Sequence, residues 1–136
     1  MYKPTLALLF LIPLLGMAKQ PNIIFILTDD QGYGDVNAHG HPYLKTPHTN
    51  KLREESVSFD NFYVSPSCSP TRAALLSGMH EFRTGVTHTI PPRQQLPEKV
   101  VCFPELLKKN GYRTGFVGKW HLGNVPGPSG QGFDWC

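Results

Sequence analysis

The stretch NIIFILTDDQG, residues 22–32, decides the fold class, because it joins a dense apolar run to a polar turn that contains glycine. An apolar run of this length, bounded by Pro21 before it and by Asp29 and Asp30 after it, is typical of a strand buried in a parallel sheet. In open α/β sheets, ligands bind beyond the carboxyl ends of the strands. The stretch therefore predicts a strand that ends beside a functional site.

Predicted strands and helices alternate along the rest of the chain. Two further strands are expected, at residues 56–64 and 112–117. Helices are expected at residues 47–55, 70–76 and 103–110, the last with Gly111 as its stop signal. The proline-rich residues 87–97 predict an exposed loop, and the tail 124–136 has no regular period. Strands separated by helices predict an α/β fold with a mostly parallel central sheet flanked by helices.

Composition limits the classes of function. The chain has 136 residues, the usual size of one domain, and its 40% apolar content is sufficient for a core. Charged residues make up only 17%, the net charge is +3, and no basic run is longer than Lys108-Lys109. This balance gives no reason to expect a nucleic-acid partner.

The N-terminus, residues 1–18, predicts a secretory signal peptide. Lys3 precedes an apolar run over 5–15, and small residues allow cleavage before Lys19. The run is short for a membrane span, so no stable span is expected, although an uncleaved anchor is the alternative. The expected location is therefore secreted or periplasmic.

The three cysteines differ in their expected roles. Export would permit a disulfide between Cys102 and Cys136, but a small buried thiol is the favoured interpretation of Cys102. Cys68 stands just before a predicted helix N-terminus, where backbone N–H groups favour negative charge. A buried structural thiol and a cysteine hydrolase are alternatives for Cys68, although no histidine partner is obvious in the sequence.

Polar clusters follow all three predicted strands. Asp29 and Asp30 would repel each other unless a cation lies between them, and calcium suits their oxygen atoms better than zinc. A polar turn is the alternative. Arg72 lies one helical turn after Cys68, where its guanidinium could hold the thiol or an anion.

The third cluster is a loop bounded by glycines. Lys119 and His121 could supply a cation and a proton donor to an anion, and an ordinary exposed loop is the alternative. Because the three clusters follow strand ends, they are expected to meet at one edge of the sheet.

These segments together resemble the sulfatase family, whose fold is of the alkaline-phosphatase-like kind. Residues 68–72 match the family's Cys-x-Pro-x-Arg core, and residues 73–78 continue it. Residues 27–32 resemble its first metal-binding strand end, and 118–123 its second signature. The resemblance extends from about Pro21 to Trp135.

The resemblance implies a role for each matched residue. A maturation enzyme would oxidise Cys68 to formylglycine, whose hydrate would attack sulfur and whose second hydroxyl would later expel sulfate. Asp29 and Asp30, together with the modified Cys68, would bind calcium. Lys119 would contact the sulfate ester. Arg72 and His121 would hold the hydrate. The substrate would be an aryl sulfate or a sulfated carbohydrate.

The chain is expected to be the N-terminal part of a longer catalytic domain, residues 19–136, because the family's remaining calcium and sulfate ligands have no match here. Asp134 lies in a tail of the wrong character to supply one. The 136 residues alone are therefore expected to be inactive and poorly stable; calcium-dependent arylsulfate hydrolysis by them would contradict this. A phosphatase or phosphodiesterase of the same superfamily, or a non-catalytic relic or binding module, are the alternatives.

Overall fold

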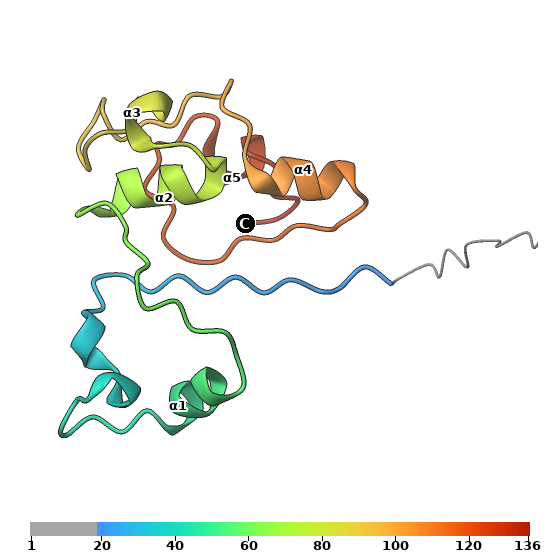
Figure 1. Ribbon diagram of the computed structural model, residues 1–136. Helices are drawn as coiled ribbons and strands as arrows, with labels where there is room; N and C mark the ends of the chain where they lie inside the picture. The colour runs from blue at the N-terminus through green and yellow to red at the C-terminus, as the bar shows by residue number, and fades with distance from the viewer. Residues whose placement is uncertain (1–18) are drawn as a thin grey trace, which may run out of the picture. The chain divides into compact units, whose positions relative to one another are not determined.

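A computed structural model describes residues 19–136, so the predicted signal peptide lies outside the described residues. The chain divides into two units, Met1–Asp30 and Gln31–Cys136, and the described helices all belong to the second (Figure 1). Within residues 19–136, no helix is both long and apolar enough to cross a membrane.

The described part of the first unit is an extended chain. Residues 22–27 form no strand ladder, and the side chains of Ile24 and Ile26 are 86% and 80% exposed. The strand predicted here is therefore absent from the described residues, as are those predicted at 56–64 and 112–117. The physical reason is that strands are stabilised by hydrogen bonds to a neighbouring strand, which an apolar sequence cannot provide for itself.

The second unit begins with short helices. They are η1 (Tyr33–Asp35), η2 (Asn37–His39) and α1 (Pro47–Glu54). Helix α1 confirms the predicted helix, with proline in its first turn. Side chains tie α1 to η2, because Asn50 Nδ2 donates to Asn37 Oδ1 at 2.8 Å and Arg53 Nη1 donates to the Ala38 carbonyl at 2.5 Å.

Four more helices follow in the second unit (Figure 1). They are α2 (Cys68–Ser77), α3 (Glu81–Thr84), α4 (Phe103–Lys109) and α5 (Gly127–Gly130). The buried apolar side chains are Ala73, Leu76, Val86, Leu96, Val100, Cys102, Leu122 and Phe133. Ala73 and Leu76 belong to α2, so this helix buries one face in the core.

Local sequence explains the length of α2. Pro70 lies in its first turn, where a missing N–H removes no helical hydrogen bond. Ala73 and Leu76, three residues apart, share the buried face. Gly78 ends the helix with a left-handed φ of 66°, and its N–H donates to the Ala74 carbonyl at 2.8 Å.

The C-terminal tail is more structured than its sequence indicated. It runs beside residues 114–116, where the Thr114 N–H donates to the Asp134 carboxylate at 2.9 Å. The Phe116 N–H donates to the Trp135 carbonyl at 3.0 Å, and one parallel bridge joins Gly115 to Trp135. Asp134 also pairs with Lys108 of α4, with 2.6 Å between Oδ1 and Nζ. Its contacts are therefore structural.

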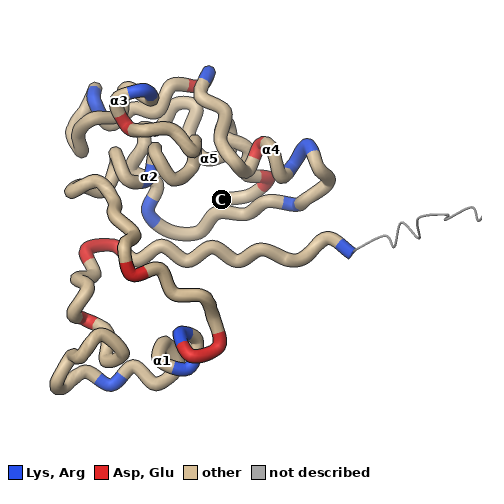
Figure 2. The backbone as a smooth tube through the Cα atoms, in the orientation of Figure 1, with Lys and Arg blue, Asp and Glu red and all other residues tan. Residues whose placement is uncertain are grey.

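The proline-rich stretch 87–97 is a loop, but it is not exposed throughout. Leu96 is 1% exposed, and its N–H donates to the Leu122 carbonyl at 3.0 Å. The loop thus forms part of the core. Figure 2 places lysine and arginine on several helices and on connecting segments rather than on one element.

The favoured interpretation of Cys102 is confirmed. Its thiol is free and fully buried, and it donates to Gln131 Oε1 at 3.2 Å. Burial, followed by the nearby charge of Glu105, raises the pKa of Cys102 to about 12. Cys136 is free and exposed. The possible disulfide between the two is therefore not formed.

Candidate active site

Cys68 is the first residue of helix α2, so it lies in the first turn rather than just before it. Its side chain is partly buried and its thiol is free. The N–H groups of a helix's first turn have no partner within the helix, and they carry the positive end of the helix dipole. A group attached at position 68 therefore lies where negative charge is favoured.

The structure brings Cys68 and His121 together, although 53 positions separate them in sequence. Cys68 Sγ lies 3.2 Å from His121 Nδ1, and His121 Nε2 lies 3.0 Å from the Thr89 carbonyl oxygen. A carbonyl can only accept, so the Thr89 contact requires the proton on Nε2, and in the neutral ring Nδ1 is then the acceptor that faces Cys68. The residue pattern alone suggested no histidine partner for Cys68, whereas the family resemblance implied that His121 holds the group at position 68. The structure places these two side chains together.

Packing holds the loop that carries His121. His121 has a φ of 56° and lies in the left-handed region, which costs a residue with a side chain about 1–2 kcal/mol. The neighbouring Trp120 packs against Phe116 and Phe133, with ring centroids 5.5 Å and 6.3 Å away. Aromatic packing thus stabilises a backbone conformation that would be unfavourable by itself.

Arg72 joins the first turns of α2 to the same loop. Its Nη1 donates to the Lys119 carbonyl at 2.6 Å, a short charge-assisted bond. Arg72 lies one helical turn after Cys68, on nearly the same face of α2, as its spacing predicted. From this position its side chain reaches the loop. Arg72 therefore holds the backbone from which Lys119 and His121 project, a role that the sequence did not indicate.

Asp29 and Asp30 end the first unit, whereas the other four predicted residues belong to the second. Asp30 is exposed and has a left-handed φ of 56°. Their oxygen atoms are of the kind that calcium prefers, but calcium takes six to eight oxygen ligands. Within residues 19–136, no group of three or more His, Cys, Asp or Glu residues is arranged to hold a metal. The two carboxylates fit calcium in kind but supply only part of a ligand set.

Thr89 is the contact that sequence reasoning missed. It acts through its backbone carbonyl, which every residue possesses, so no side-chain pattern could mark it. It also lies in a stretch whose prolines indicated only an exposed loop. Its partner, His121, was recognisable because a glycine-bounded loop carried it.

The sequence profile of the Sulfatase family matches residues 21–136. The chain belongs to the sulfatase family. It is 45% identical to mouse arylsulfatase J over 122 residues, which is 85% of this chain and 20% of that protein. Identity to human arylsulfatase A is 42% over 138 residues, which covers 96% of this chain and 27% of the relative. Human N-acetylgalactosamine-6-sulfatase is 41% identical over 132 residues, covering 88% and 25%.

Solved structures agree with this assignment to the sulfatases. The crystal structure of Ps i-CgsB gives a TM-score of 0.80 at 38% identity, over 86% of this chain and 28% of that one. BT4656, solved with its substrate D-glucosamine-2-N,6-O-disulfate, gives 0.75 at 36% identity, over 86% and 23%. The predicted alkaline-phosphatase-like α/β fold, present only in part, is thereby confirmed, and the chain spans 20–28% of the length of these relatives.

Proposed function

We propose that this sulfatase-family chain serves the hydrolysis of sulfate monoesters, with the residue derived from Cys68 as the nucleophile. The observation that carries the proposal is the 3.2 Å contact between Cys68 and His121 at the start of α2. This contact brings together side chains from two of the family's motifs. It also places His121 Nδ1, a proton acceptor, beside the reacting side chain at position 68.

The chain's own residues have separate tasks in this proposal. The first turn of α2 favours negative charge beside position 68. His121 Nδ1 accepts a hydrogen bond from the group at position 68, while Thr89 holds the ring from the other side. Lys119 offsets charge on the sulfate ester, and Arg72 fixes the loop that presents it.

Two groups would complete the site. When Cys68 has matured to formylglycine, its hydrate supplies the attacking oxygen. Calcium, held in part by Asp29 and Asp30, would supply positive charge for the sulfate oxygens. These assignments are supported by the family match and by the chemistry of the residues present.

The names of the relatives support a substrate class for the whole protein. Two are named arylsulfatases, a third acts on an N-acetylgalactosamine-6-sulfate according to its name, and BT4656 was solved with a sulfated glucosamine. We propose an aryl sulfate or a sulfated carbohydrate as the substrate of the whole protein.

A mass spectrum of the protein from its native host tests the proposal. Trypsin should release the peptide from Glu54 to Arg72, which contains Cys68. We expect formylglycine at position 68, trapped as an adduct by a hydrazine reagent. A fully alkylatable cysteine at this position would contradict the proposed maturation and would favour a non-catalytic relic or binding module.

The same sample tests the proposed export. Cleavage of the signal peptide predicts a mature N-terminus at Lys19. Recovery of the intact residues 1–18 on the purified protein would contradict secretion by this route and favour an uncleaved anchor.

A further inference from the structure

Thr89 and Ile90 share one peptide group, and each of its two polar atoms has a histidine as partner. The Thr89 carbonyl oxygen lies 3.0 Å from His121 Nε2. The Ile90 N–H donates to His88 Nδ1 at 3.2 Å. A trans peptide group is planar, and its C=O and N–H point in opposite directions, so turning one of them turns the other. His88 and His121 therefore hold the same peptide group from opposite sides.

The two imidazoles have different tasks at this peptide group. A backbone N–H can only donate, so His88 Nδ1 is an acceptor and carries no proton. His121 Nε2, by contrast, donates to the carbonyl. Hydrogen bonds in a chain polarise one another, so a peptide group whose N–H is bonded accepts more strongly at its oxygen. The bond to His88 therefore strengthens the hold on His121.

The backbone of the proline-rich loop keeps His88 in place. The N–H groups of Thr87 and His88 both donate to the Arg93 carbonyl, at 3.0 Å and 3.3 Å. The bond from the Leu96 N–H to the Leu122 carbonyl attaches the same loop to the residue that follows the site histidine. The loop is therefore closed on itself and fixed beside the candidate active site.

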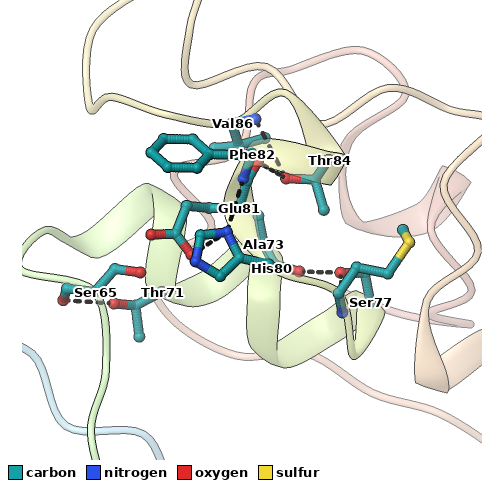
Figure 3. A network of polar contacts seen from close by, with 10 residues as sticks. Ser65, Thr71, Ala73, Ser77, His80, Glu81, Phe82, Thr84 and Val86 are labelled. Carbon is teal, nitrogen blue, oxygen red and sulfur yellow. Dashed lines mark hydrogen bonds and ion pairs between the residues drawn. The ribbon is translucent and has the colours of Figure 1, made fainter.

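The turn made by the His88 side chain also occurs at His80 and His41. At His80, the Phe82 N–H donates to Nδ1 at 3.3 Å (Figure 3). At His41, the N–H groups two and three residues later donate to Nδ1, at 3.2 Å and 2.8 Å. Asparagine side chains accept an N–H two residues later in the same way. Of these three turns, the one at His88 is the one whose carbonyl meets His121.

We propose that His88 is a positioning residue for the active site. It fixes the Thr89–Ile90 peptide group, and the carbonyl of that group then holds His121 with Nδ1 toward position 68. The inference deepens the proposed function, and its catalytic meaning rests on that function. The geometry itself can be tested without catalysis.

Exchange of the carbon-bound hydrogen between the two ring nitrogens reports how firmly each histidine is held. This hydrogen exchanges slowly with deuterated water when the ring is fixed and covered, and faster when the ring can turn into solvent. The chain has six histidines, and trypsin cleavage after Lys119 separates His121 from the rest. Peptide mass spectrometry of the full chain then gives the rate at His121, whether position 68 carries a thiol or formylglycine.

His88→Phe keeps a planar ring but removes the acceptor for the Ile90 N–H. We expect His121 to exchange about fivefold faster in this variant, the factor that corresponds to the loss of roughly one net hydrogen bond. His88→Ala should give the same acceleration, and it takes the place of the first variant if that one does not fold. His88→Asn should restore the parent rate, because its side-chain oxygen can accept the same N–H.

His41→Phe is the matched control. It removes a turn of the same kind, and His41 is partly buried as His88 is. The rate at His121 should stay unchanged in this variant, and the rate at His80 should stay unchanged in all of them.

Three results would overturn the proposal. The first is a parent rate at His121 in the His88→Phe and His88→Ala variants, and the second is a failure of His88→Asn to restore that rate. The third is an acceleration that is not specific to His88. It would be seen as a faster rate at His121 in His41→Phe, or as a rate at His80 that rises together with that at His121.

This exchange measurement and the mass spectrum of the native protein can fail independently. A chain that never matures to formylglycine can still hold His121 through His88. A chain that does mature can have a His121 ring that is insensitive to His88.

Discussion

Helix α2 and the extended segment 22–27 both have strong sequence signals, but the described structure treats them differently. The helix forms and buries Ala73 and Leu76, whereas the segment leaves Ile24 and Ile26 largely exposed. A helix makes its hydrogen bonds within a few residues of the same chain. A strand makes them with another strand. A local signal is therefore sufficient to form the first element but not the second.

The largest expected difference in unfolding free energy is between truncation of a buried side chain and truncation of an exposed one. Leu96→Ala should lower the free energy of unfolding by about 2–5 kcal/mol, because Leu96 is 1% exposed in the core beside Leu122. Ile24→Ala should change it by less than about 0.5 kcal/mol, because that side chain is exposed. Urea unfolding followed by circular dichroism measures both.

If Leu96→Ala and Ile24→Ala lowered the free energy of unfolding equally, the difference between the core and the extended segment would be contradicted. They would mean that the segment 22–27 is packed in solution as firmly as the core. A small loss at Leu96 alone would instead mean that the core of the second unit is loosely formed.

A smaller effect tests whether α2 is locally determined. Gly78→Ala should cost about 1 kcal/mol, because Gly78 ends the helix at a φ of 66°, which alanine adopts with strain. Gly34→Ala is the matched control, since open space surrounds that glycine as well and its backbone lies outside the left-handed region. Thermal unfolding of the two variants should separate them, and equal melting temperatures would contradict a local end to α2.

The smallest expected effect is on the melting temperature, and it comes from Asp134 in the C-terminal tail. The hydrogen bond from Lys108, followed by that from the Thr114 backbone, lowers the pKa of Asp134 from 3.8 to about 2. A lowered pKa in the folded state stabilises the protein above the unfolded value, and this contribution is lost as the pH falls through about 2. Asp134→Asn should therefore lower the Tm at pH 7 slightly, since Lys108 is half exposed and solvent screens the pair.

The pH dependence distinguishes this charge effect from a change of shape. The difference in Tm between parent and Asp134→Asn should persist down to about pH 4 and disappear as the pH approaches 2. A difference that stays constant over this range would show that the carboxylate charge contributes nothing.

Sequence reasoning identified the reactive side chains of the site but few of the residues that hold them in place. Cys68 and His121 were recognisable from residue type and from the loops that carry them, and the structure places them 3.2 Å apart. The supports were not recognisable. Thr89 acts through a backbone carbonyl, which no side-chain pattern marks.

The sequence by itself determined the helices α1, α2 and α4, the position of Cys68 at a helix start and the family, because each depends on short-range patterns of residue type. Only the tertiary structure decided that the tail and the proline-rich loop belong to the core, and that Arg72 holds the loop of Lys119. These contacts join residues that lie tens of positions apart. Their formation depends on how apolar surfaces pack and on which backbone groups then find partners, and neither is encoded in a local pattern.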